Sequence, residues 1–229
     1  MSTQEITKPF ELSPVDQASS GITTEELVNT ITHGAGAIGS IVALIVLLLR
    51  ACHCVPDEAM ASAVTGFSVF GASMFILYTI SSIYHAISKP ELKAKFKVLD
   101  HCAIYLLISG SYTAFAMTLL PNWIGWTIFG INWALALTGI FIFAVLKNHS
   151  RYISMTLYLL MGWMIIFAVK PLLEAAPAPV IRFLVYGGLS YTAGCYFYLK
   201  KNCTWSHPVW HLFVLAGSFF HFIAAYLIY

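Results

Sequence analysis

Long apolar stretches alternate with short polar connections along most of the chain. Each stretch is apolar over roughly 17 to 25 residues, the length that a helix needs to cross a lipid bilayer. Charges, prolines or turn residues bound every stretch. The pattern predicts an all-α integral membrane protein with seven transmembrane helices, at residues 27–49, 60–84, 99–118, 123–145, 152–169, 180–199 and 208–228.

Composition agrees with a membrane environment. Of the 229 residues, 59% are hydrophobic and 10% are charged, whereas soluble domains typically contain about 25% charged residues. Residues 1–22 are polar and contain no apolar run, so we expect a disordered tail without a signal peptide. Residues 23–229 are expected to form one transmembrane domain. No nucleic-acid-binding module is visible, and the net charge of +2 does not indicate an acidic partner.

The distribution of cations predicts how the chain is oriented. Nine of the 12 Lys and Arg residues lie on the side of the membrane that holds the N-terminus, whereas Arg50, Lys170 and Arg182 lie on the other. Cytoplasmic connections are enriched in Lys and Arg. We therefore expect a cytoplasmic N-terminus, an external C-terminus and, for the lysine-rich run at 89–97, a solvated cytoplasmic loop.

Four polar residues are predicted to share the cytoplasmic half of the membrane. His85 ends the second predicted span, Asp100 begins the third, and His207 and His211 begin the seventh. Asp100 is the one acidic residue that falls inside a predicted span. Because a carboxylate inside a membrane normally faces a partner or a cavity, a functional site is the first interpretation.

The spacing of two histidines is compatible with metal binding. His207 and His211 are four residues apart, so on a helix both imidazoles project from one face. We expect Ser206 to be the N-cap of this helix. With His85 and a water held by Asp100, the pair would give three protein ligands and one open position, as in catalytic zinc sites. The alternative is that each histidine separately bonds a carbonyl or hydroxyl group.

Further polar residues leave two interpretations open. Glu26, Asn29 and His33 fall on one face of the first predicted helix, but Thr23 and Glu26 also fit a capping box. We expect His33 to bond neighbouring helices near the site. His221 is ten residues beyond the histidine pair, too far for the same metal, and is either a hydrogen-bonding residue or part of a cavity wall.

Four motifs in order carry a resemblance to a known family. They are EELVNTITHGAGAIGS at 25–40, SSIYH at 81–85, LDHCAIYLLISGSY at 99–112, and SHPVWH at 206–211 followed by FFHF. Together they resemble the haemolysin III branch of the progestin and adipoQ receptor (PAQR) family. The resemblance implies a seven-helix protein of the bacterial cytoplasmic membrane, with its N-terminus in the cytoplasm and a zinc ion near the cytoplasmic side.

The resemblance also assigns roles to residues. Matched motif by motif, it implies His85, His207 and His211 as zinc ligands, Asp100 as the holder of a water, and Ser81 as a neighbour that assists catalysis. Adiponectin-receptor members are associated with hydrolysis of lipid amides such as ceramide. The expected function is therefore zinc-dependent hydrolysis of a lipid-like substrate, with membrane lipids as partners. The alternatives are a lipid or membrane-state sensor with structural zinc, and a pore former.

Overall fold

The computed structural model describes residues 22–120, 122–147, 150–200 and 204–229. The predicted tail, apart from Ile22, lies outside the described residues. Within the described parts the chain is helical and contains no strand. The elements are α2 (Thr24–Cys54), α3 (Asp57–Ala86), α4 (Pro90–Leu119), α5 (Asn122–Ile140), the π-helical turn η2 (Phe141–Val145), α6 (Arg151–Gly162), the 3₁₀ turn η3 (Met164–Ala168), α7 (Val169–Ala175), α8 (Ala178–Leu199) and α9 (Ser206–Tyr226).

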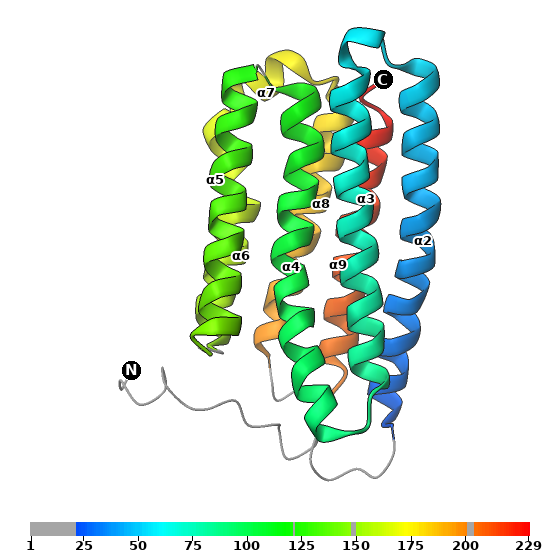
Figure 1. Ribbon diagram of the computed structural model, residues 1–229, viewed down its shortest axis with the longest axis vertical. Coiled ribbons are helices and arrows are strands. Elements are labelled where there is room, and N and C mark those ends of the chain that lie inside the picture. Colours follow the sequence, from blue (N-terminus) through cyan, green and yellow to red (C-terminus); the bar gives the residue numbers. More distant parts are fainter. Residues whose placement is uncertain (1–21, 121, 148–149, 201–203) are drawn as a thin grey trace.

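The long helices run side by side as a bundle (Figure 1). The most extensive packing joins α3 to both α2 and α4, and α8 to α9. Glycines allow the close approach of α3 and α4, since a Cβ on Gly66 would lie 2.9 Å from Ala114 Cα. A Cβ on Gly110 would lie 2.1 Å from Ser73 Oγ. Helix α3, which carries Ser81 and His85, is therefore packed closely against α4, and α9 joins the bundle through its contacts with α8 and α2.

Six helical segments are long and apolar enough to cross a membrane. They are Thr24–Cys54, Asp57–Ala86, Pro90–Leu119, Trp123–Val145, Arg151–Ala175 and Ser206–Tyr226. The chain is thus an all-helical, multi-pass membrane protein. The predicted span at 180–199 corresponds to α8, which runs along the bundle beside α9 (Figure 1) but is not among the six. Arg182 and a run of Gly, Ser, Thr and Tyr make α8 less apolar than the others.

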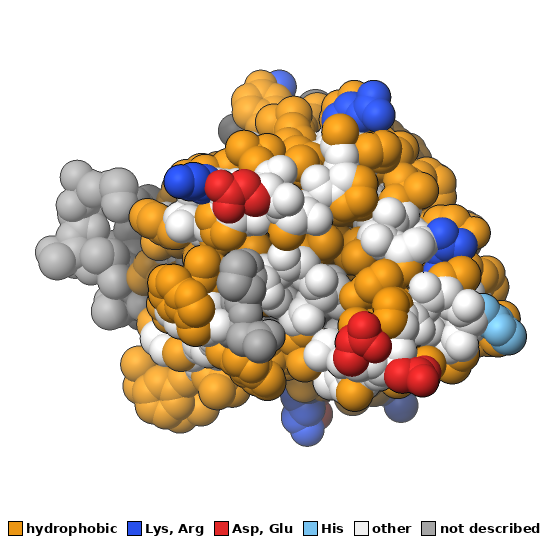
Figure 2. Space-filling view, turned by 90° about the horizontal axis from the view of Figure 1, so that it is seen from above, with side chains coloured by type: hydrophobic (Ala, Val, Ile, Leu, Met, Phe, Trp, Pro, Cys, Tyr) orange, Lys and Arg blue, Asp and Glu red, His pale blue; other side chains and the backbone are white. Residues whose placement is uncertain are grey.

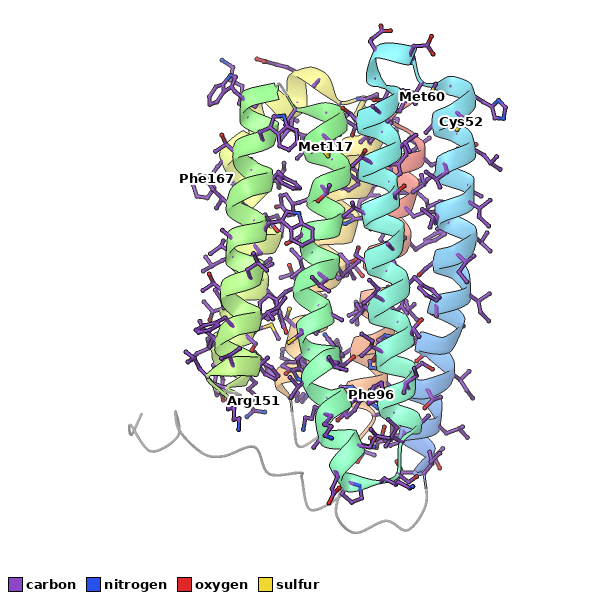
Figure 3. The ribbon with its side chains drawn as sticks, viewed as in Figure 1. Cys52, Met60, Phe96, Met117, Arg151 and Phe167 are labelled. Carbon is purple, nitrogen blue, oxygen red and sulfur yellow. The ribbon has the colours of Figure 1, made fainter. Side chains whose placement is uncertain are left out.

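The surface of the bundle is apolar, as expected of helices that face lipid. On α2, Ile31 and Ile38 are exposed while Asn29 and His33 are buried, so the polar side of this helix faces the protein. Phe167 points away from the bundle and is 88% exposed (Figure 3). Seen from the end where α2 connects to α3, hydrophobic side chains predominate and charged groups of both signs are scattered among them (Figure 2).

The structure corrects the prediction for the lysine-rich run at 89–97. Helix α4 begins at Pro90, so KPELKAKFK forms the first turns of a helix rather than a loop. Proline fits the first helical position. The negative charge of Glu91 is stabilising near the N-terminus of the helix, which is the positive end of the helix dipole. The scan for apolar spans missed this extension because it is helical but polar. Lys93 is buried, with only 7% of its surface exposed.

The start of α9 also differs from the prediction. The N-cap position is occupied by Trp205, in the left-handed region with φ of 69°, and not by Ser206. The Trp205 backbone N–H donates to Glu25 Oε1 at 3.2 Å. Ser206 Oγ instead donates to the carbonyl of Lys200 at 2.9 Å. Contacts from two other segments thus fix the entry into the helix that carries the histidine pair.

The fifth apolar segment is interrupted where α6 passes into η3 and α7. Tyr112 of α4 bridges this break, because its hydroxyl donates to the Gly162 carbonyl at 2.9 Å and accepts from the Ile165 N–H at 2.8 Å. One side chain therefore satisfies two backbone groups that the interrupted helix leaves unpaired.

Candidate metal centre

Three histidines from two helices converge at the end of the bundle where α3 connects to α4. His85 lies in the last turn of α3, and His207 and His211 lie in the first turns of α9. His207 Nε2 is 3.3 Å from His85 Nε2 and 3.1 Å from His211 Nε2. One ligand nitrogen from each residue lies within 4.8 Å of the others.

This spacing fits a shared metal ion. In tetrahedral zinc sites each nitrogen lies about 2.0–2.1 Å from the metal, which places neighbouring nitrogens about 3.3 Å apart. Three histidine nitrogens are a common ligand set of catalytic zinc sites. Without a cation, three converging Nε2 atoms would require protons to be shared in short N–H···N contacts. The group of His85, His207 and His211 could therefore hold a metal ion.

Asp100 and Ser81 lie beside this group without joining it. Both are buried, with exposed fractions of 2% and 0%. The Asp100 carboxyl, from α4, is within interaction distance of His85 and of Ser81, which lies one turn before His85 on α3. Ser81 Oγ nevertheless has no hydrogen-bond partner of acceptable geometry among the described residues. Asp100 contributes no atom to the group of potential ligands.

Glu26 reaches the site from α2. Its backbone N–H donates to Thr23 Oγ1 at 3.2 Å, which is one half of the capping box. Its side chain does not return to the cap: Oε2 contacts Nδ1 of His85, and Oε1 accepts from Lys93 Nζ at 2.6 Å. Glu26 therefore has both of the roles that the sequence left open: its backbone takes part in the helix cap, and its carboxylate faces the histidine group.

A model of the family described as haemolysin-III related matches residues 22–222, which contain all four sequence motifs. The chain belongs to the haemolysin III family. It is 44% identical to "Hemolysin-3" of Bacillus cereus, over 85% of this chain and 87% of that protein. It is 39% identical to "Hemolysin-3 homolog" of Bacillus subtilis (strain 168), over 85% of this chain and 89% of that protein.

A more distant relative supports the assignment of this haemolysin III protein to the wider PAQR family. The chain is 24% identical to the human "Monocyte to macrophage differentiation factor", over 68% of this chain and 67% of that protein. The resemblance inferred from the four motifs is thereby confirmed.

Unpartnered polar atoms surround the histidine group of this haemolysin III protein. His33 is 1% exposed, and its ring stacks on that of His211. The sequence led us to expect His33 to bond neighbouring helices, but neither of its nitrogens has a hydrogen-bond partner among the described residues. Asn29 Oδ1 and His211 Nδ1 are likewise buried without a partner there. Buried polar atoms normally have partners, so this region has the donors and acceptors for water or a polar ligand next to a metal.

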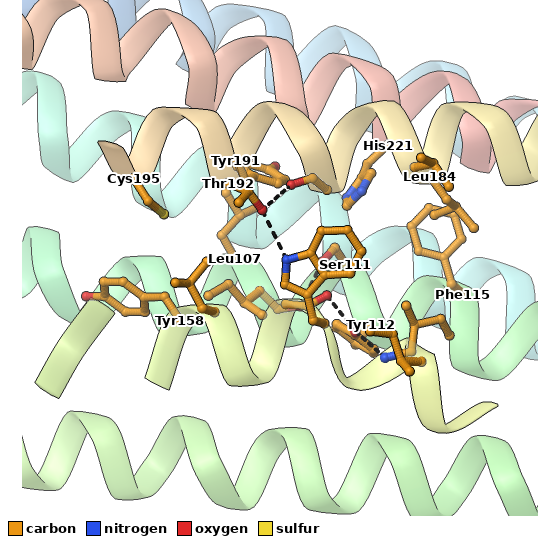
Figure 4. A pocket seen from close by; sticks show the side chains of 18 of the residues that line it. Leu107, Ser111, Tyr112, Phe115, Tyr158, Leu184, Tyr191, Thr192, Cys195 and His221 are labelled. Atoms are coloured by element: carbon orange, nitrogen blue, oxygen red, sulfur yellow. Dashed lines mark hydrogen bonds between the residues drawn. The ribbon is translucent and has the colours of Figure 1, made fainter. Parts of the chain in front are cut away.

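An apolar cavity of about 260 Å³ lies deeper in the bundle. Side chains from α4, α6, α8 and α9 line it, among them Phe115, Tyr158, Leu184 and His221 (Figure 4). His221 therefore forms part of a cavity wall, one of its two predicted roles. Its Nδ1 has no hydrogen-bond partner among the described residues.

Trp210 separates the cavity from the histidine group. It lines the cavity, and its ring centroid lies 5.2 Å from that of His207 and 5.4 Å from that of His211. None of the three histidines lines the cavity itself. Sequence reasoning missed this residue and Lys93, because a tryptophan or a lysine in these positions looks like an ordinary packing or loop residue. Only the tertiary arrangement places them next to the site.

Proposed function

We propose that this protein is a zinc-dependent hydrolase of lipid amides in the bacterial cytoplasmic membrane. The observation that carries the proposal is the convergence of His85, His207 and His211 with a buried carboxylate beside them. Three neutral imidazoles with one open position suit a catalytic zinc ion, whereas structural zinc sites are usually closed by four protein ligands.

Each residue would have a distinct task. When bound, zinc would make a water acidic enough to ionise near neutral pH and would polarise the carbonyl under attack. The three histidines would hold the ion, and Asp100 would orient the water and accept its proton. Ser81 is buried with an unpartnered hydroxyl, so it is available to donate a hydrogen bond to the developing oxyanion.

The apolar cavity supports a lipid-like substrate. Its wall is formed almost entirely by hydrocarbon and aromatic groups, which suit an acyl chain, and it comes close to the histidine group at Trp210. A substrate whose chain occupied the cavity would present its polar end toward the metal. Ceramide and related long-chain amides have this form.

The proposed topology has seven crossings with the N-terminus in the cytoplasm. In support, α2 begins at one end of the bundle and α9 ends at the other, which requires an odd number of passes (Figure 1). Helix α8 supplies the pass that the six strongly apolar segments lack. The excess of Lys and Arg on the N-terminal side supports a position of the histidine group in the cytoplasmic half.

A lipid sensor without turnover is the second candidate, and the position of Trp210 favours it. A ligand in the cavity would contact the ring of Trp210, which packs against the two α9 histidines, and would not reach the metal. Pore formation ranks last, although two relatives carry the name hemolysin. The apolar wall of the cavity lacks the polar lining of a water-filled conduit.

The experiment that tests the hydrolase is a comparison of loaded and stripped protein. Purified protein with zinc, protein stripped with a chelator, and stripped protein reloaded with zinc are incubated with long-chain amides. Free fatty acid is then measured by mass spectrometry. The proposal expects product from the first and third samples only. Zinc-loaded protein that binds these lipids but releases no product would instead favour the sensor.

A further inference from the structure

A buried lysine contacts the proposed metal site indirectly. Lys93 lies in the N-terminal extension of α4, and its side chain is 8% exposed. Its Nζ donates to Glu26 Oε1 at 2.6 Å and lies 5.4 Å from the centre of the Tyr84 ring. Burying an ammonium group is costly unless it is paired, so this position requires a carboxylate partner.

Glu26 uses both carboxylate oxygens at once. One oxygen accepts from Lys93, and the other contacts Nδ1 of His85. An Nδ1–H that donates to this carboxylate leaves the Nε2 lone pair of His85 facing the other two histidines. Side chains in this position commonly fix the orientation of metal-bound histidines.

The resulting contact chain joins three helices. It runs from Lys93 on α4 through Glu26 on α2 to His85 on α3. The backbone of Glu26 is itself held by its bond to Thr23. A purely structural ion pair would need only Lys93 and Glu26, whereas this chain continues to Nδ1 of His85, the ring nitrogen opposite the one that faces the other two histidines.

We propose that Glu26 and Lys93 are positioning residues of the metal site, with Lys93 acting through Glu26 on the orientation of His85. The inference rests on the proposed zinc centre. If Lys93 were lost, Glu26 Oε1 would have no charged partner and the carboxylate could rotate away from His85. The metal would then bind to a site with one poorly oriented ligand.

The test measures zinc affinity in detergent-purified full-length protein by competition with a chelator. The variants are Glu26→Gln, Lys93→Gln, the double variant and Lys93→Arg. The matched control is Lys95→Gln, which changes an exposed lysine on the same helical extension. Visible absorption of cobalt(II)-loaded protein reports the ligand geometry, and melting without metal checks that each variant is folded.

Loss of a residue that hydrogen-bonds to a metal ligand typically weakens metal affinity by about 10- to 100-fold. We expect a loss of this size for Glu26→Gln and for Lys93→Gln, with a changed cobalt(II) spectrum. The zinc affinity of the double variant should equal that of Glu26→Gln to within about threefold, since Lys93 acts through Glu26. Lys93→Arg should recover most of the affinity, and Lys95→Gln should match wild type.

Several outcomes would overturn the inference. Wild-type affinity in Lys93→Gln, losses that multiply in the double variant, or no recovery in Lys93→Arg would each do so while leaving the zinc proposal intact. Wild-type protein that binds no zinc would remove the proposed function and this inference together.

Discussion

The ring of His33 on α2 stacks on the ring of His211 on α9, with centroids 3.5 Å apart and planes 6° apart. The rings of His33 and Tyr78 also pack in a T-shaped arrangement, with centroids 5.0 Å apart. His33 therefore packs against the proposed ligand His211, although its own nitrogens do not belong to the group of potential ligand atoms. The geometry indicates a supporting role, in which its flat ring holds His211 in place.

This relationship predicts different results for two substitutions of His33. His33→Phe keeps a flat ring against His211 and should retain zinc, whereas His33→Ala removes the ring and should weaken zinc binding by up to about 10-fold. Zinc affinity from chelator competition distinguishes the two variants. Complete loss of zinc in His33→Phe would make His33 a ligand and contradict the supporting role.

The histidine group predicts the metal content of the protein. Purified protein should contain about one zinc per chain, and His207→Ala or His211→Ala should empty the site because two histidines hold zinc weakly. Elemental analysis measures this directly. The exposed His53 provides the control, since His53→Ala should keep full occupancy. Equal zinc in all four proteins would show that the ion is bound elsewhere.

The break between α6 and η3 predicts a stability effect at Tyr112. Tyr112→Phe removes the hydroxyl that bonds Gly162 and Ile165, and a buried group left unpaired costs about 1–3 kcal/mol. The variant should melt at a lower temperature in detergent. Tyr186, which is half-exposed, serves as the control, and Tyr186→Phe should leave the melting temperature unchanged. Equal melting of wild type and Tyr112→Phe would mean that water replaces the bridge.

Much of the fold followed from the sequence because the bilayer imposes a simple rule. An apolar stretch of sufficient length becomes a helix, so every predicted span lies on described helices. The bounds differ most at α4, which begins at Pro90 rather than at residue 99, and at α7, which continues to Ala175 rather than ending at residue 169. Two features did not follow. The polar first turns of α4 carry no apolar signal, and the interruption after Gly162 depends on Tyr112, which is distant in sequence.

The site was partly predictable for a similar reason. The i, i+4 spacing of His207 and His211, and the shared depth of His85, can be derived from helical geometry. Lys93 and Trp210 could not be found in this way, because their importance depends on which helices are neighbours. The N-cap at Trp205 was also unpredictable, since contacts with Glu25 hold a conformation that an isolated tryptophan avoids.

The seven-pass topology predicts opposite locations for the two termini. A reporter fused after Tyr229 should be active outside the cytoplasm, and a tag before Met1 should remain inside. Protease accessibility in intact and opened cells provides a second measurement. Both termini on one side would require an even number of crossings, and α8 would then not span the membrane.

Hydrolysis of a long-chain lipid amide by wild type and Asp100→Asn tests the central claim most directly. Asparagine keeps the shape of the side chain but accepts no proton, so zinc should remain bound while the rate falls by about 10²- to 10⁴-fold, the usual contribution of a general base. Product is measured by mass spectrometry, with zinc content determined on the same samples and a chelated wild type as control. The account predicts product from wild type, a large loss in Asp100→Asn at equal zinc, and none from the chelated protein. Fully zinc-loaded wild type that yields no product across a broad panel of lipid amides would contradict it, and equal product from all three samples would identify a contaminant.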